Sequence, residues 1–228
     1  MGSITDGIKA VIFDFDGTLY YPKGMKKRLV LSSIFHLSLV LRDRKFRRIY
    51  KGVDFGSADE FRRAYVYFLA DGKKSSFEKV SSWKNKVYMP SMTRILEKGF
   101  PARSDIFEVF NKLHEQGIKT AVFSDYDFVP ERVAAIGADG ISGNLFSSEE
   151  LGLLKPCPRG FFEIARILDV APSEVLVVGD RDDTDGQGAR NCGMKFIHIL
   201  NKDFEKKEAD GVDAHRLSWE NFSRMILS

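Results

Sequence analysis

The chain has 228 residues, 43% of them apolar, which is enough to bury one substantial core or one core with a small accessory domain. Lys and Arg number 35 against 32 Asp and Glu, and the net charge of +3 is too small to indicate nucleic acid or a membrane as a partner. We therefore expect a globular protein without these two partners, whose oligomeric state the sequence leaves open.

The N-terminus, the cysteines and the longest apolar stretch each exclude a class of protein. Residues 1–9 are polar and lack the apolar core of a signal peptide, so we expect a cytoplasmic protein. Cys157 and Cys192 show no CxxC pattern and no His at zinc-ligand spacing, which argues against a disulfide framework and a zinc site. The longest apolar stretch, residues 29–41, contains polar residues and is shorter than the roughly 20 residues of a membrane span.

Short apolar runs alternate with helical patterns along most of the chain. The first run, residues 9–13, is rich in β-branched residues and ends at an acidic loop, as a buried parallel strand does. Further strands are predicted at residues 120–123, 140–145, 175–178 and 196–200, and helices at 106–116, 130–136, 158–168 and 185–192. This alternation predicts an α/β fold with a doubly wound, mostly parallel sheet and helices on both faces.

Residues 20–103 interrupt this alternation. They show helical apolar spacing and no clear strand, so we expect an inserted helical domain, with residues 1–19 and 104–228 forming the α/β core. The aromatic stripe of Phe61, Tyr65 and Phe68 is expected to form the core of this insert.

Helix boundaries can also be predicted within the insert. Ser57 and Ser75 are each followed three residues later by Glu, the pattern of a capping box at a helix start. Pro90 is expected to break the third helix, and Gly99 with Pro101 to close a fourth on the way back to the sheet.

Polar side chains end three of the predicted strands. Asp14 and Asp16 follow the first, Ser124 ends the second, and Asp180 follows the fourth; Lys155 lies in a loop that enters a helix. Ligands of open α/β sheets bind outside the carboxyl ends of the strands, so we expect these side chains to form one site.

These residue types suit phosphoryl transfer. Asp14 could attack a phosphoryl group, provided that a hard cation such as Mg²⁺, held by Asp14 and Asp180, neutralises the repulsion between the two anions. Asp16 could protonate the leaving alkoxide and later accept a proton from the attacking water.

A second group of residues could bind the phosphate itself. Gly17, with Thr18 beside it, allows the backbone to turn closely around a phosphate, and Ser124 could bind phosphoryl oxygens. Lys155 could balance the charge of Asp14 and of the phosphate.

Four segments in this order resemble the signature of the haloacid dehalogenase superfamily. They are Asp14-Phe15-Asp16-Gly17-Thr18-Leu19, the strand ending in Ser124, Lys155-Pro156, and Gly179-Asp180-Arg181-Asp182-Asp183-Thr184-Asp185. The resemblance covers essentially the whole chain and places a cap where the helical insert lies. It implies a Rossmann-like core.

The resemblance also implies roles for individual residues. Asp14 would be the nucleophile, Asp16 the general acid/base and a metal ligand through its backbone carbonyl, and Asp180 a metal ligand. Asp185 would support the metal waters or Lys155. The name-giving dehalogenases lack an acid at the position of Asp16, which favours phosphoryl chemistry for this chain.

The sequence departs from this pattern at two positions and leaves two acidic residues open. Asp125 stands where many relatives have a neutral residue, and a carboxylate there would repel phosphate unless it points away or meets a residue of the insert; we place it at the phosphate site, where it could help to select the leaving group. Cys157 stands where many relatives have Asp. Asp182 and Asp183 could touch the metal, although solvated side chains are the simpler expectation.

The densest basic run, residues 42–51, interleaves Arg and Lys with Phe46 and Tyr50. It could be a solvated helix end with cations near the negative end of the helix dipole. Alternatively, Arg47 and Arg48 could act as forks for a second anionic group of the substrate.

The sequence therefore predicts an enzyme. The leading hypothesis is a Mg²⁺-dependent phosphatase that hydrolyses a small phosphorylated metabolite through an aspartyl-phosphate intermediate. One alternative is a phosphomutase of the β-phosphoglucomutase type, which would use the same residues. The other is a non-catalytic regulatory protein that binds phosphate or a partner.

Overall fold

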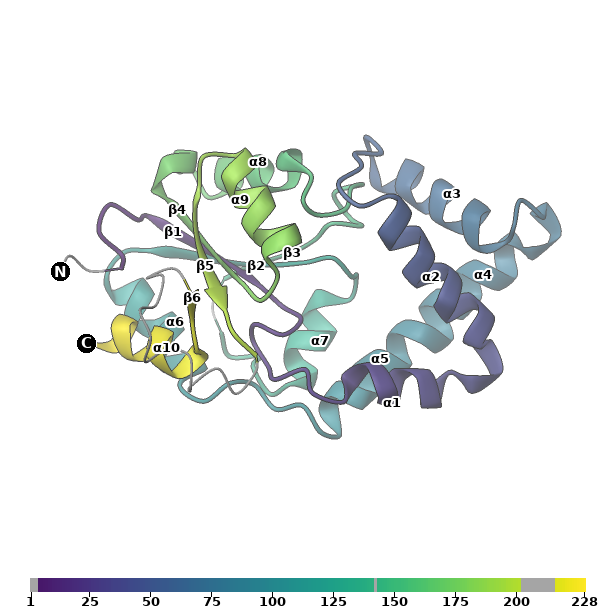
Figure 1. Cartoon of the computed structure of the whole chain (residues 1–228), viewed down its shortest axis with the longest axis horizontal. Coiled ribbons are helices and arrows are strands. Elements are labelled where there is room, and N and C mark those ends of the chain that lie inside the picture. The colour runs from purple at the N-terminus through teal and green to yellow at the C-terminus, as the bar shows by residue number, and fades with distance from the viewer. Residues whose placement is uncertain (1–3, 142, 202–215) are drawn as a thin grey trace.

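A six-stranded sheet forms the centre of the protein. The computed structural model describes residues 4–141, 143–201 and 216–228. The sheet contains β1 (Ala10–Asp14), β2 (Lys119–Ser124), β3 (Asn144–Ser147), β4 (Val175–Gly179), β5 (Lys195–Ile199) and β6 (Arg216–Leu217). All neighbouring strands are parallel and their order is β3-β2-β1-β4-β5-β6, which confirms the predicted α/β fold (Figure 1).

The central strand is buried on both faces. Val11 and Phe13 of β1 belong to one apolar cluster, while Ala10 and Ile12 belong to the other, because successive side chains of a strand point to opposite faces. The helices that cover the first face are α6 (Ile106–Glu115), α7 (Val129–Ala135) and α10 (Trp219–Leu227). The other face is covered by α8 (Pro158–Ile167) and α9 (Gln187–Asn191).

The sequence located most of these elements. The strand predicted at residues 140–145 lies later, at Asn144–Ser147, because its pairing with β2 runs from Ala121↔Asn144 to Ser124↔Ser147. Residue 142 of that prediction lies outside the described residues. The sequence analysis did not find β6 or α10, and the π-helical turn Asp182–Gly186 precedes α9.

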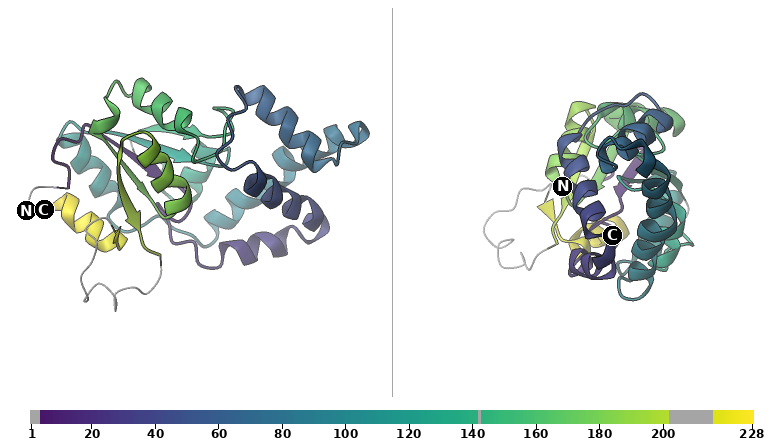
Figure 2. Two further views of the ribbon diagram at one scale, coloured as in Figure 1. Left: turned by 45° about the horizontal axis from the view of Figure 1, so that its top comes forward. Right: turned by 90° about the vertical axis from the view of Figure 1, so that its right-hand side faces the viewer.

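Helices occupy the segment between β1 and β2, as predicted. They are α1 (Met25–Ser32), α2 (Leu37–Ile49), α3 (Ala58–Leu69), α4 (Phe77–Trp83) and α5 (Met89–Glu97). Short 3-10 turns lie at Ile34–His36, Lys74–Ser76 and Pro172–Glu174, and a π-helical turn lies at Lys84–Tyr88. These helices pack together beside the sheet, on the side to which β1 leads (Figures 1 and 2). We call residues 20–103 the insert; its exact limits stay a prediction.

Aromatic rings form the core of the insert. The ring of Phe46 lies 5.8 Å from that of Phe61, 5.2 Å from that of Tyr65 and 5.5 Å from that of Phe68. The aromatic stripe is therefore packed inside the insert, as predicted.

Within the described residues, no helix is long and apolar enough to cross a membrane.

Two of the helix-boundary predictions in the insert were wrong. Ser57 does cap α3 by accepting a hydrogen bond from the Glu60 amide at 3.2 Å. Ser75 caps nothing, because it lies in a 3-10 turn and α4 begins only at Phe77. Pro90 does not end the helix either: α4 continues through the π-helical turn into α5, and Pro90 lies in the first turn of α5, where a missing N–H is tolerated.

The insert contacts the core at both of its ends and also at a point in the middle of its sequence. Tyr20 and Ala102 form an antiparallel bridge where the chain enters and leaves. A second bridge joins Asp54 to Leu153, and the Gly52 amide donates to the carbonyl of Lys155 at 3.2 Å. The loop that carries Lys155 is therefore bonded directly to the insert.

Candidate active site

A buried lysine joins two carboxylates at the carboxyl ends of the strands. Lys155 Nζ lies 2.8 Å from Asp14 Oδ1, 2.8 Å from Asp185 Oδ1 and 2.6 Å from the carbonyl oxygen of Phe123. Burial lowers the pKa of Lys155, but Asp14 and Asp185 outweigh this effect and raise it above its ordinary value. The ammonium group therefore stays charged and holds both carboxylates in place.

Three carboxylates gather at this point. One oxygen from each of Asp14, Asp180 and Asp185 lies within 4.8 Å of the other two. Burial, followed by the charge of Asp185, raises the pKa of Asp14 well above its ordinary value, although Lys155 acts in the opposite direction. Burial, followed by Asp185 and Asp16, raises the pKa of Asp180 to about 7. The three groups carry more negative charge than one lysine can balance.

The acidic group fits a divalent cation. Asp180 Oδ1 is buried and has no hydrogen-bond partner among the described residues, whereas Oδ2 accepts from Asn201 at 3.0 Å. An unpaired buried carboxylate oxygen beside two other carboxylates is a suitable ligand for Mg²⁺, which prefers oxygen. The observed arrangement is therefore consistent with the metal ligands expected from the sequence.

Gly17 allows the first loop to pass close to this group. It has φ +89°, and a Cβ atom there would lie 2.1 Å from Asp180 Oδ2. Its carbonyl accepts from Asn201 at 2.7 Å. Thr18 is buried, and its hydroxyl donates to Asp14 Oδ2 at 3.1 Å. In this structure Thr18 thus orients Asp14.

Asp16 lies beside the acidic group but is held by other residues. Tyr20 donates to Asp16 Oδ1 at 2.7 Å, and Arg132, whose side chain is completely buried, pairs with Oδ2. Arg132 also donates to Ser124 Oγ at 2.8 Å. One arginine therefore links the predicted acid/base to the predicted phosphate-binding serine.

The Asp125 side chain is turned toward the loop of Lys155. Its Oδ1 accepts from Ser148 Oγ at 2.7 Å and from the Lys155 amide at 3.1 Å. Its backbone carbonyl accepts from Arg47 of the insert at 2.9 Å. The carboxylate thus supports the lysine loop, and these contacts give no support to its placement at the phosphate.

Asp182 and Asp183 lie apart from the acidic group. Their side chains are more than half exposed, and Asp182 pairs with Arg190 while Asp183 pairs with Arg181 and Lys51.

Cys157 and Cys192 are both buried and form no disulfide, as expected, and burial raises the pKa of Cys192 to about 11.

Two residues of the site were not predicted from the sequence. Arg132 has helical spacing with the apolar Val129 and Ile136, and this spacing could have placed it on their buried face. Asn201 follows β5, so the rule that strand ends carry the site could have found it.

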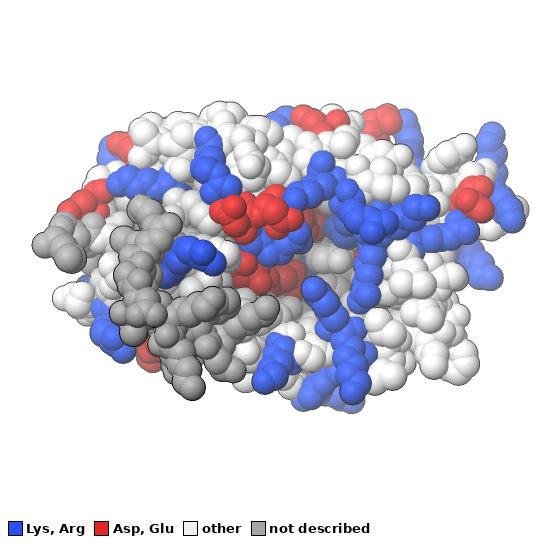
Figure 3. Space-filling view, in the orientation of Figure 1, with Lys and Arg blue, Asp and Glu red and all other residues white. Residues whose placement is uncertain are grey.

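Charge is unevenly divided between the two parts of the chain. Residues 20–103 contain 20 Lys and Arg against 7 Asp and Glu, a net charge of +13, whereas the rest of the chain contains 15 against 25, a net charge of −10. Figure 3 shows acidic side chains near the middle of one face, with Lys and Arg concentrated over the insert beside them. The acidic site therefore lies next to a basic insert.

Known proteins share both the sequence pattern and the fold. A glyceraldehyde 3-phosphate phosphatase of Methanopyrus kandleri is 28% identical over 90% of this chain and 91% of its own. A protein of the same name from Methanothermobacter thermautotrophicus is 23% identical over 92% and 93%.

Solved structures show the same architecture. A 2-haloacid dehalogenase of Pseudomonas syringae superposes with a TM-score of 0.58 at 20% identity, covering 92% of this chain and 91% of its own. A HAD phosphatase of Thermococcus onnurineus gives a TM-score of 0.55 at 19% identity, covering 90% and 98%. The profile of the haloacid dehalogenase-like hydrolases matches residues 8–193, and the chain belongs to this family.

Proposed function

We propose that this protein is a Mg²⁺-dependent phosphatase of a small phosphorylated metabolite that works through an aspartyl-phosphate on Asp14. The observation that carries the proposal is the contact of Lys155 with Asp14 and Asp185, inside a group of three carboxylates that fits a divalent cation. The curated relatives named as phosphatases support the same class of reaction.

The cation would be held by the side chains of Asp14 and Asp180 and the backbone carbonyl of Asp16, with Asp185 beside it. When bound, it would neutralise the repulsion between Asp14 and the anionic substrate. Lys155 adds a fixed positive charge next to Asp14, and the Ser124 hydroxyl can donate to a phosphoryl oxygen. These residues would orient the phosphoryl group toward Asp14.

The reaction would take place in two displacements. A carboxylate oxygen of Asp14 forms a bond to phosphorus, the bond to the substrate alkoxide breaks, and Asp16 gives the alkoxide a proton. Water then attacks the phosphorus of the aspartyl-phosphate, Asp16 accepts its proton, and orthophosphate leaves. Tyr20 and Arg132 hold Asp16 beside Asp14 between these steps.

The helices of residues 20–103 would act as a cap that covers the substrate. A covered site excludes bulk water and strengthens the electrostatic interactions within it. The hydrogen bonds between the insert and the Lys155 loop support this role, since they hold the insert against the catalytic side of the core.

Release of orthophosphate from 4-nitrophenyl phosphate, with and without Mg²⁺, tests the proposal. Glyceraldehyde 3-phosphate is the first natural substrate to try, because two relatives carry its name. A phosphatase should release phosphate without any sugar bisphosphate activator, whereas a phosphomutase would need one. A protein that binds phosphate without turnover in any of these assays would contradict the proposal.

A further inference from the structure

Arg47 reaches from the insert to the core and is fully engaged there. Its side chain is only 12% exposed, and each guanidinium nitrogen donates to an oxygen: Nε to Asp43 at 3.1 Å, Nη1 to the Asp125 carbonyl at 2.9 Å and Nη2 to Glu149. The guanidinium also lies 3.7 Å from the centre of the Tyr126 ring. Arg47 is therefore neither a solvated cation nor a free fork.

Glu149 neutralises a second cation of the insert at the same time. Lys84, which is 13% exposed, donates to Oε2 of Glu149, while Arg47 donates to Oε1. Burial alone would raise the pKa of Glu149, but the charges of Lys84 and Arg47 outweigh it and hold the pKa below its ordinary value. One buried carboxylate of the core thus pairs with two inward-facing cations, and Asp43 of the insert supplies the second negative charge beside Arg47.

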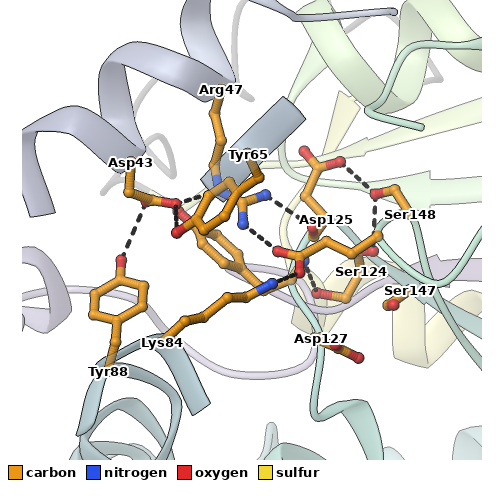
Figure 4. A network of polar contacts seen from close by, with 12 residues as sticks. Asp43, Arg47, Tyr65, Lys84, Tyr88, Ser124, Asp125, Asp127, Ser147 and Ser148 are labelled. Carbon is orange, nitrogen blue, oxygen red and sulfur yellow. Dashed lines mark hydrogen bonds and ion pairs between the residues drawn. The ribbon is translucent and has the colours of Figure 1, made fainter. Parts of the chain in front are cut away.

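The insert holds Arg47 rigidly in this position. Asp43, which is completely buried, accepts from Tyr65 at 3.0 Å and from Tyr88 at 3.3 Å in addition to Arg47. Three helical segments of the insert therefore converge on the group that orients the guanidinium (Figure 4). Arg47 has little freedom to turn toward another partner.

This network borders the candidate phosphate site. Arg47 binds the carbonyl of Asp125, the residue after Ser124. Ser148, the neighbour of Glu149, donates to Asp125 Oδ1 at 2.7 Å and to the Ser124 carbonyl at 3.1 Å. The Arg47 and Glu149 pair is therefore linked through Asp125 and Ser148 to the backbone of Ser124.

We infer that the organic part of a substrate bound at Ser124 faces the Arg47 and Glu149 pair, and that Glu149 is a specificity-determining residue that selects substrates whose organic part carries no second negative charge. This inference rests on the proposed function. A second anion near Arg47 would meet cations already paired and a buried carboxylate that repels it, so it would bind only by leaving Glu149 without partners. An aldehyde or alcohol group incurs no such cost.

Two matched compounds test the inference. Glyceraldehyde 3-phosphate carries an aldehyde where 3-phosphoglycerate carries a carboxylate. Each compound can be tested as an inhibitor of 4-nitrophenyl phosphate hydrolysis, and its inhibition constant reports binding even if the compound is not hydrolysed. The parent protein should bind the aldehyde at least about tenfold more tightly, a difference of about 1.4 kcal/mol. In Glu149→Gln this preference should shrink at least tenfold or reverse.

Glu150→Gln is the matched control, because Glu150 is the exposed neighbour of Glu149. It should leave the ratio of inhibition constants unchanged. If Glu149→Gln does not fold, as judged by its melting curve, Lys84→Gln provides the opposite test: it leaves Glu149 with one cation, so the preference for the aldehyde should grow.

The two proposals fail in different ways. Active variants with parental ratios, or equal losses for both compounds, would overturn the role of Glu149 and leave the phosphatase intact. Absence of aryl phosphate hydrolysis in the parent protein would instead overturn the proposed function.

Discussion

Lys155 Nζ lies 2.8 Å from Asp14 Oδ1, so the proposed nucleophile is held by a cation that comes from 141 residues further along the chain. Replacing this cation by Lys155→Met would leave Asp14 and Asp185 buried without it. We expect a loss of about 3 to 5 kcal/mol in the free energy of unfolding, the usual cost of removing one partner of a buried pair. Urea unfolding measures this loss, and the exposed Lys98→Met serves as control. A variant as stable as the parent would show that the pair contributes little.

Asp14→Asn should reduce phosphate release by about three orders of magnitude or more, because an amide does not form the acyl phosphate. The fold should persist, since Asp14 is the last residue of β1 and its burial as an anion is already unfavourable. Activity and melting temperature should be measured together, with the exposed Asp6→Asn as control. Substantial turnover by Asp14→Asn would disprove covalent catalysis by this residue.

Chelation should abolish activity, and Mg²⁺ should restore it. We expect Ca²⁺ to fail, because its larger and more variable coordination shell would misplace Asp14. Mg²⁺ should also raise the melting temperature, since it would relieve the repulsion among the three clustered carboxylates. Asp180→Asn should lose most of that increase. Activity that survives exhaustive chelation would rule out the metal.

Asp16→Ala should impair hydrolysis of alkyl phosphates more than that of aryl phosphates. An alkoxide needs a proton as it leaves, whereas a nitrophenolate leaves without one, so the difference should be about 10²-fold or more. The ratio of kcat/KM for glycerol 3-phosphate and 4-nitrophenyl phosphate measures it. Equal losses on both substrates would show that Asp16 mainly positions the backbone.

Gly17→Ala should damage the site through a single methyl group. The new Cβ atom would lie 2.1 Å from Asp180 Oδ2, so the carboxylate or the loop must move, and the Mg²⁺-induced stabilisation should fall with the activity. Gly7→Ala is a close control, because Gly7 also has positive φ, +73°, but a Cβ atom there meets nothing within 4 Å. Comparable losses of activity in Gly17→Ala and Gly7→Ala would show that the effect comes from backbone conformation alone.

The sequence predicts what depends on local pattern. The buried strands and the Asp14, Ser124 and Asp180 positions follow from apolar runs that end in polar residues, and the structure confirms the α/β fold. Contacts between distant segments do not follow from such patterns. The pairing of Glu149 with Arg47 joins a core loop to a helix 102 residues away, beyond the range of any local sequence pattern.

The same limit explains the errors within the insert. Ser75 and Pro90 carry valid local signals for a helix start and a helix break, but the packed insert overrides both. Tertiary packing stabilises a helix more than its boundary residues do, so local signals fail there first.

The bridge between Asp54 and Leu153 limits how this enzyme could be recombined with its relatives. A foreign insert joined to the core at residues 20 and 103 would also have to fit a third point of contact with the core. There the Phe55 amide donates to the Gly152 carbonyl at 2.9 Å. The two chain segments approach closely at this contact, since a Cβ atom at Gly152 would lie 2.2 Å from the backbone of Ser57. The transferable module is therefore the insert together with residues 147–155, and every such exchange would also replace the loop that carries Lys155.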